Sequence, residues 1–144
     1  MVRFWDTSAL VPLLVEEATS ESCRVLLQAN LPMVVWALTR TELASAVWRR
    51  ARAGDIELAA MPVVIDRLAA LAARWNEVTD LDLVRDRADR LLAVHALRAA
   101  DALQLAAALV VCEERPKGRD FITSDGALAT CARAEDFTVI VPKG

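Results

Sequence analysis

The sequence contains few residues that interrupt regular structure. Four glycines and five prolines are spread over 144 residues, so long helices and strands are expected, and the abundance of alanine and leucine favours helices. Long apolar runs are absent as well: the longest, Leu105–Cys112, is far shorter than the roughly 20 residues of a membrane span. A hydrophobic content of 56% still suffices for one buried core. We therefore predict a single domain over residues 1–144 and no membrane association.

Cysteine and histidine are also scarce, which excludes several kinds of site. The cysteines Cys23, Cys112 and Cys131 are odd in number and include no C-x-x-C pair, which argues against a disulfide framework and a zinc site. Free thiols indicate a reducing, cytoplasmic setting, and the apolar run before Asp6 is too short for a signal peptide. The single histidine, His95, excludes a metal-free ribonuclease mechanism that needs two histidines within one chain.

Positive charge does not exceed negative charge. The chain has 17 Lys and Arg against 20 Asp and Glu, a formal net charge of -3. It therefore lacks the overall basic charge of a general nucleic-acid binder. A nuclease with a local basic face and a metal-filled acidic site is compatible with this balance.

The apolar pattern predicts strands that alternate with helices. Strands are predicted at residues 2–5, 33–36, 121–123 and 137–141, and residues 75–79 fit either a strand or a loop. Helices are predicted at residues 9–17, 20–29, 39–53, 62–74, 81–94, 99–114 and 127–134. This order predicts an α/β/α sandwich with a mostly parallel central sheet of four to five strands flanked by helices.

Three local features of the helices can be tested against the structure. Gly54 is expected to cap the carboxyl end of the helix over 39–53. The helix over 99–114 is apolar nearly all round, so it should be largely buried. The helix over 81–94 should bury one stripe, made of Leu81, Val84, Ala88, Leu91 and Leu92.

Four acidic residues occupy special places in this pattern. Asp6 and Asp125 each follow a predicted strand, and Glu42 lies in the first turn of the helix after another. The carboxyl ends of parallel strands share one edge of a sheet, so these three should meet. Asp101 lies among alanines and leucine, where a carboxylate is costly unless it is paired, hydrogen-bonded or bound to metal. Such a group favours Mg²⁺ or Mn²⁺ and metal-assisted phosphodiester hydrolysis.

Helix capping is the ordinary explanation of the same residues. Each acid lies near a helix start, where side-chain oxygens accept hydrogen bonds from free backbone N–H groups. The segment Thr39–Glu42 matches a capping box. Capping accounts less well for Asp101 and for the shared edge.

The segments around the four acids resemble the PIN-domain nucleases and, among these, the VapC toxins of type II toxin–antitoxin systems. The matching stretches are FWDTSALV at Phe4–Val11, TRTELASA at Thr39–Ala46, LRAADALQLAAA at Leu97–Ala108 and FITSDGALA at Phe121–Ala129. They follow the order found in the family, and the resemblance covers essentially the whole chain. It implies a PIN-like sandwich fold.

The resemblance also implies an activity, a cofactor and partners. It implies an endoribonuclease toxin that uses Mg²⁺ or Mn²⁺ to cut tRNA or ribosomal RNA, forms a homodimer and is inhibited by a cognate VapB-type antitoxin. The implied catalytic and metal-binding residues are Asp6, Glu42, Asp101 and Asp125. The implied supporting hydroxyls are those of Thr7, Ser8 and Thr123.

Several arginines are candidates for contacts with RNA. Arg98 is favoured because it lies close to Asp101, and Arg40 and Arg49 are weaker candidates. The run Trp48–Arg52 combines an aromatic ring with guanidinium groups, which suits stacking and phosphate contact. The preferred interpretation of this run is a solvated helix face, with its tryptophan in the core or in a dimer contact.

Two other functions are compatible with an α/β chain of this size. A phosphoacceptor receiver domain also gathers acids at strand ends, but it usually needs an acidic pair after the first strand and a lysine near the last. Here Asp6 has no adjacent acid, and the only lysines are Lys117 and Lys143. A non-catalytic PIN-like module that binds RNA or protein is the other alternative, against which the intact set of acids speaks.

Overall fold

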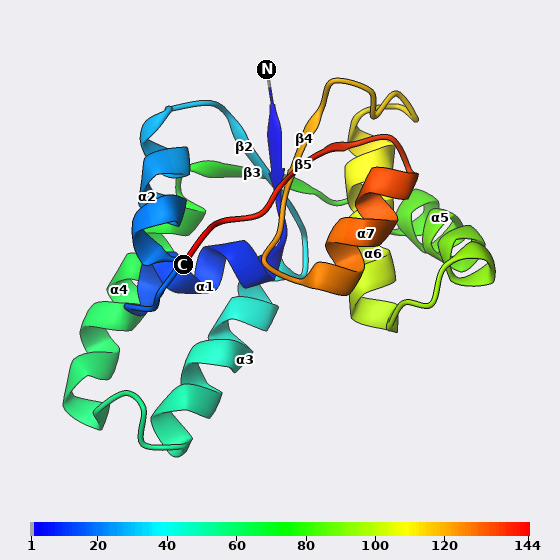
Figure 1. Ribbon diagram of the computed structural model, residues 1–144. Helices are drawn as coiled ribbons and strands as arrows, with labels where there is room; N and C mark the ends of the chain where they lie inside the picture. Colours follow the sequence, from blue (N-terminus) through cyan, green and yellow to red (C-terminus); the bar gives the residue numbers. More distant parts are fainter. Residues whose placement is uncertain (1) are drawn as a thin grey trace.

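Five parallel strands form the central sheet of the computed structural model, which describes residues 2–144 (Figure 1). Met1 of the predicted domain lies outside the described residues. The strands are β1 (Arg3–Trp5), β2 (Met33–Trp36), β3 (Trp75–Val78), β4 (Asp120–Ile122) and β5 (Thr138–Ile140). Their order in the sheet is β3-β2-β1-β4-β5, and every neighbouring pair is parallel. The predicted α/β class is therefore confirmed, and the ambiguous segment 75–79 contains a strand.

Within the described residues, seven α-helices cover the two faces of the sheet. Helices α1 to α4 lie on one side of it and α5 to α7 on the other, which gives a helix–sheet–helix sandwich (Figure 1). The helices are α1 (Thr7–Leu14), α2 (Ser20–Gln28), α3 (Thr39–Arg52), α4 (Met61–Ala72), α5 (Leu81–Val94), α6 (Ala99–Val111) and α7 (Gly126–Ala134), with a 3₁₀ turn at Leu58–Ala60.

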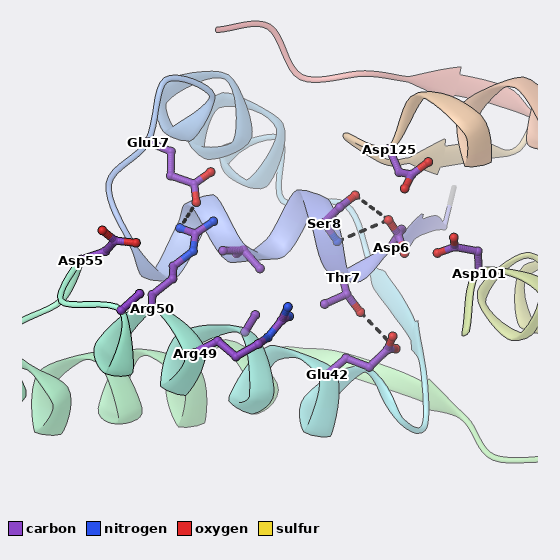
Figure 2. Close-up of a pocket in the computed structure, with 13 residues that line it drawn as sticks. Asp6, Thr7, Ser8, Glu17, Glu42, Arg49, Arg50, Asp55, Asp101 and Asp125 are labelled. Atoms are coloured by element: carbon purple, nitrogen blue, oxygen red, sulfur yellow. Dashed lines mark hydrogen bonds and ion pairs between the residues drawn. The ribbon is translucent and has the colours of Figure 1, made fainter. Parts of the chain in front are cut away.

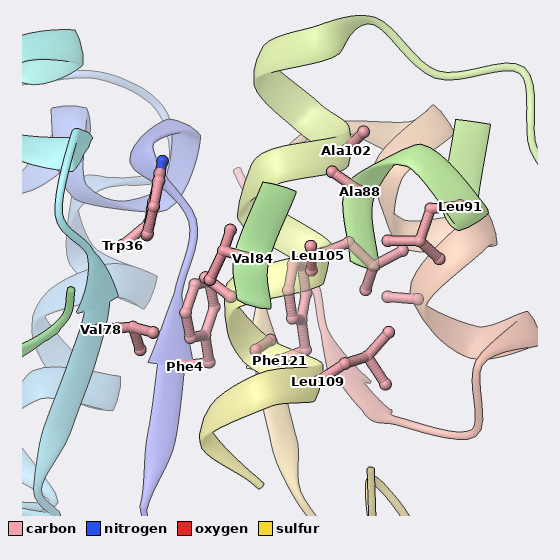
Figure 3. Packing of buried hydrophobic residues seen from close by; sticks show 14 of the residues in the cluster. Phe4, Trp36, Val78, Val84, Ala88, Leu91, Ala102, Leu105, Leu109 and Phe121 are labelled. Atoms are coloured by element: carbon pink, nitrogen blue, oxygen red, sulfur yellow. The ribbon is translucent and has the colours of Figure 1, made fainter. Parts of the chain in front are cut away.

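Successive strand residues point to opposite faces of the sheet and so build two separate cores. Phe4 of β1 stacks on Phe121 of β4 with ring centroids 5.3 Å apart, and both pack against Leu105 of α6 (Figure 3). The next residue of each strand, Trp5 or Ile122, packs on the other face with α1, α3 and α4. Burial on both faces explains why the residues that follow Arg3 in β1 and Asp120 in β4 are all apolar.

Helix α6 is largely buried, as its apolar circumference predicts, because it packs between the sheet and α5 (Figure 3). It ends at Val111 rather than at Glu114. Glu113 and Glu114 have φ values of 54° and 58°, which end the helical path. Among residues 2–144 no single helix combines the length and apolar composition of a membrane span; α5 and α6 meet that test only together, across a bend of 118°.

The carboxyl end of α3 confirms the predicted role of Gly54. Its φ of +85° lies in the left-handed region, which glycine adopts at no steric cost. The N–H of Gly54 donates to the carbonyl of Ala51, and the N–H of Asp55 donates to the carbonyl of Arg50. This pair of bonds is a Schellman motif, which satisfies carbonyls that the helix leaves free.

The stripe predicted for α5 is only partly correct. Val84, Ala88 and Leu91 are buried, whereas Leu81 is 50% exposed and Leu92 is 41% exposed. The buried three follow the i, i+4, i+7 spacing of a narrow contact with a single neighbouring helix, α6. At 3.6 residues per turn, the two exposed leucines both fall on one side of this line.

Candidate active site

A cleft of about 550 Å³ opens at the carboxyl edge of the sheet. It lies where the strand order reverses between β1 and β4, the usual place for ligands in open parallel sheets. Its lining side chains come from the start of α1, from α3 and α6, and from the turn that leads into α7 (Figure 2). All four acids singled out by the sequence are among them, namely Asp6, Glu42, Asp101 and Asp125.

Asp6 lies directly after β1 and caps the amino end of α1. Its Oδ2 accepts hydrogen bonds from the Ser8 backbone N–H (3.3 Å), the Ser8 hydroxyl (2.5 Å) and the Thr123 hydroxyl (2.9 Å). The side chain is only 4% exposed. Burial raises the pKa of Asp6, these hydrogen bonds oppose the rise, and the charge of Asp125 adds to it. Asp6 therefore both caps a helix and lines the cleft.

Asp125 has the corresponding position after β4, at the amino end of α7. Its Oδ1 accepts a hydrogen bond from the Leu128 backbone N–H (2.9 Å). The hydroxyl of Thr123 accepts from the Asp125 N–H (3.1 Å), and the hydroxyl of Ser8 accepts from the Ser124 N–H (2.9 Å). The predicted supporting hydroxyls Ser8 and Thr123 thus connect the ends of the two central strands.

Glu42 is held by neutral donors, and the predicted capping box is wrong. The residue that caps α3 is Leu38, which contributes no side-chain hydrogen bond. The Thr39 hydroxyl instead lies 3.2 Å from Gln104 Nε2, and Glu42 Oε1 accepts from Gln104 Nε2 (2.8 Å) and the Thr7 hydroxyl (3.2 Å). Burial raises the pKa of Glu42, while the hydrogen bond from Gln104 lowers it.

Asp101 enters the cleft from the first turn of α6. It accepts no hydrogen bond from the described residues, although a carboxylate at a helix start is favoured by the helix dipole. Burial, and then the negative charges of Asp125 and Asp6, raise the pKa of Asp101 to about 6, against the opposing effect of Arg98. The charges of Asp125 and Asp6 therefore lie close enough to Asp101 to act on its carboxyl group.

Each of the four acids keeps a carboxylate oxygen free of protein donors within residues 2–144. The hydrogen bonds reach Oδ2 of Asp6, Oε1 of Glu42 and Oδ1 of Asp125, and none reaches Asp101. Free carboxylate oxygens that line one cleft fit the ligand preference of Mg²⁺ and Mn²⁺. No three Asp, Glu, His or Cys side chains of the described chain already converge into a complete coordination site.

The candidate RNA-contacting arginines separate into two groups. Arg49 and Arg50 line the cleft, whereas Arg40 and Arg98 do not (Figure 2). Arg50 forms an ion pair with Glu17. Arg49 has no carboxylate partner within residues 2–144. Arg49 is thus the guanidinium in the cleft that is free to meet an anion.

Other features of this region were not predicted. Gln104, Glu17 and Asp55 escaped notice, although Gln104 could have been found as the single polar residue in the apolar run 102–111. Trp48 is 40% exposed on α3, so it does not pack in the core, and a dimer contact, the other predicted position, stays a prediction.

The receiver-domain alternative is not supported by the topology. Receiver domains have the strand order 2-1-3-4-5, whereas this sheet has the order 3-2-1-4-5. The reversal of strand order therefore falls between different strands, and the acids here follow β1 and β4. The arrangement instead suits an acidic metal-binding cleft.

Comparison with known proteins supports the same fold. No protein-family model matches the chain, and no curated protein matches it significantly. Its structure is similar to a chain in the crystal structure of VapBC2 from Rickettsia felis bound to a DNA fragment from their promoter, with a TM-score of 0.66 and 11% identity. The match covers 99% of this chain and 100% of that chain. The protein therefore has a PIN-like α/β/α sandwich fold.

Proposed function

We propose that this protein is a Mg²⁺- or Mn²⁺-dependent endoribonuclease that acts as the toxin of a type II toxin–antitoxin system. One observation carries the proposal. Four carboxylates from separate parts of the chain line one cleft at the switch point of the sheet. None of them forms an ion pair with an arginine or lysine among residues 2–144. Uncompensated carboxylates of this kind suit a divalent cation.

The proposed cation would be held by the free oxygens of Asp6, Glu42, Asp101 and Asp125. When bound, such an ion activates a water molecule and neutralises charge on the phosphate and the leaving oxygen. The protein's own contribution is to orient the carboxylates before the ion arrives. Ser8 and Thr123 fix one oxygen of Asp6, and the start of α7 fixes one oxygen of Asp125.

RNA binding in this cleft requires positive charge, because phosphates would otherwise meet a surface rich in carboxylates. We assign this role first to Arg49, which lines the cleft and has no acidic partner in the described chain. Arg50 is already neutralised by Glu17. Arg40 and Arg98 are not among the residues that line the cleft, although Arg98 lies close enough to Asp101 to oppose the rise in its pKa.

The remaining parts of the proposal concern substrate and partners. The proposed substrate is tRNA or ribosomal RNA, and the proposed partners are a VapB-type antitoxin and a second copy of the chain. The structural likeness to a chain of VapBC2 supports the antitoxin. The three free cysteines, of which Cys23 and Cys112 are buried, fit a cytoplasmic location.

The direct test replaces the carboxylates without changing their shape. Asp6→Asn and Asp101→Asn should each lower cleavage of total RNA in Mn²⁺ by about a thousandfold, because they weaken the binding and orientation of the cation. Asp89→Asn, an exposed position on α5, is the matched control and should cleave like the parent. Chelation of divalent ions should abolish cleavage by the parent.

Two outcomes would contradict the proposal. Undiminished cleavage by Asp6→Asn and Asp101→Asn would show that the cleft is not the reaction site. Metal-independent binding of RNA without cleavage would instead favour the non-catalytic PIN-like module.

A further inference from the structure

Helix α6 presents a second polar side chain near the cleft, one turn beyond Asp101. Gln104 is only 1% exposed and is surrounded in sequence by apolar residues. Its Nε2 lies within hydrogen-bonding distance of Glu42 Oε1 (2.8 Å), the Thr7 hydroxyl (2.9 Å) and the Thr39 hydroxyl (3.2 Å). One buried amide therefore connects α6 with α1 and α3.

The hydrogen bonds around this amide converge on a single oxygen. The Thr7 hydroxyl accepts from Gln104 and donates to Glu42 Oε1 (3.2 Å), the same atom that Gln104 Nε2 reaches directly. Chains of this kind polarise each other and strengthen. Both donors are neutral, so they orient the carboxylate and leave its charge intact, whereas an arginine or lysine there would compete with a cation.

The other end of the amide carries a cost in stability. Gln104 Oε1 is buried and has no hydrogen-bond donor among residues 2–144. A buried carbonyl without a donor lowers stability, and an apolar residue of similar volume would avoid that loss in an otherwise apolar helix. The amide therefore leaves its oxygen unsatisfied while its Nε2 reaches Glu42, Thr7 and Thr39, and Glu42 is the only charged group among these.

We propose that Gln104 is a positioning residue of the metal site, which fixes Glu42 Oε1 so that Oε2 is presented to the divalent cation. The inference rests on the proposed function, because it assumes that Glu42 is a ligand. It also explains how Glu42 on α3 is kept in a fixed position relative to Asp101 on α6. Asp101 and Gln104 lie three residues apart on α6, so the amide sets the place of Glu42 relative to Asp101.

The test measures metal binding as well as activity. Mn²⁺ is titrated into the full-length protein by calorimetry, and its effect on the melting temperature is followed in parallel. Gln104→Met preserves volume and removes the donor, and it should weaken Mn²⁺ binding 10- to 100-fold, the usual effect of removing a group that orients a ligand. Gln104→Asn, which retains an amide on a shorter side chain, should weaken binding less.

The control separates positioning from a general loss of stability. Asp120→Asn breaks an ion pair with Arg3 at the opposite edge of the sheet, and it should lower the melting temperature while leaving the Mn²⁺ affinity within about twofold of the parent. Excess Mn²⁺ should restore RNA cleavage by Gln104→Met. It should not restore cleavage by Glu42→Gln, in which the ligand itself is changed.

The outcomes distinguish the inference from the proposed function. If the parent binds Mn²⁺ and Gln104→Met binds it equally well, Gln104 is not a positioning residue although the metal site stands. If the parent neither binds Mn²⁺ nor cleaves RNA, both proposals are overturned. If Gln104→Met does not fold, Thr7→Val removes the hydroxyl that relays to the same oxygen and should weaken Mn²⁺ binding severalfold; unchanged binding would overturn the inference.

Discussion

Buried carboxylates are held differently at the two edges of the sheet. At the amino edge, Asp120 at the start of β4 accepts a hydrogen bond from the Arg3 guanidinium at 3.0 Å, and the two charges cancel. At the carboxyl edge, Asp6 after β1 accepts only from a backbone N–H and from the hydroxyls of Ser8 and Thr123. The first arrangement stabilises the fold. The second orients a carboxylate without neutralising it.

The same contrast holds between the helical layer and the cleft. Glu135, just after α7, forms an ion pair with Arg87 (3.1 Å), so this acid is compensated by a neighbour on α5, and it lies 2.8 Å from His95 Nε2. Glu42 in the cleft is bound by Gln104 and a hydroxyl. His95 lies in the compensated network, away from the cleft lining, which agrees with a structural role. Charge is thus left uncompensated where we propose that the cation binds.

Addition of metal is expected to have the largest effect on stability. A divalent ion that binds only the folded state at 100 times its Kd should raise the free energy of unfolding by about 2.7 kcal/mol. Differential scanning fluorimetry with and without Mn²⁺ measures this rise. Asp120→Asn should retain the full shift, whereas Asp6→Asn should lose most of it. If neither Mg²⁺ nor Mn²⁺ changes the melting temperature of the parent, the carboxyl edge does not differ from the amino edge in metal binding.

Neutralising one acid at each edge should then have opposite consequences for the metal-free protein. Asp120→Asn leaves the largely buried guanidinium of Arg3 without its counter-charge, so we expect a loss of about 2 kcal/mol in urea denaturation. Asp6→Asn removes a buried negative charge that has no cationic partner, so the free energy of unfolding should stay the same or rise. Equal losses in both variants would mean that Asp6 is also a structural acid.

Arg49 gives a smaller and more specific test. Arg49→Ala should lower kcat/KM for RNA cleavage about tenfold, because one charge-assisted contact to a phosphate is lost. The loss should shrink as salt is raised, since exposed charges are screened. Arg52→Ala is the matched control: it lies on the same helix but outside the cleft lining, and it should have little effect. Equal effects of both substitutions would indicate only a general loss of positive charge.

The smallest expected effect is a pH dependence of stability that comes from Asp101. Its pKa of about 6 in the folded protein lies above the ordinary value of 3.8, so the folded state holds this proton more tightly than the unfolded state. The contribution of Asp101 to the free energy of unfolding is therefore fully present below about pH 4 and is lost as the pH rises through about 6. Without metal, Asp101→Asn should therefore raise the melting temperature at pH 7.5 and have no effect at pH 4. The gain should stay below about 1 kcal/mol, because the carboxylate is half-exposed and screened.

Two other outcomes for Asp101→Asn would show which assumption about this residue is wrong. A loss of stability at pH 7.5 would mean that the attraction of this carboxylate to the amino end of α6 exceeds the repulsion from its neighbours. An equal gain at both pH values would mean that packing, and not charge, responds to the substitution.

Local sequence patterns were sufficient for most of the secondary structure. The strand over 33–36 and the helix over 81–94 have the predicted bounds, because continuous apolar runs and a 3.6-residue period are properties of the nearest neighbours in sequence. The strand at 75–78 was ambiguous, since Asn76 and Glu77 are exposed at the edge of the sheet. An edge strand with polar residues in its middle has no distinctive pattern.

The sequence by itself also predicted that Asp6, Glu42 and Asp125 share one cleft, because the carboxyl ends of parallel strands meet at one edge whatever the packing details. Asp101, in the first turn of α6, was added from its apolar surroundings in the sequence and from the family resemblance. Only the tertiary structure decided which oxygen of each acid is engaged, that Gln104 rather than a capping box holds Glu42, and that Arg49 rather than Arg98 lines the cleft. These depend on how α1, α3 and α6 dock against one another. That docking places residues from separate segments in contact, which no local periodicity encodes.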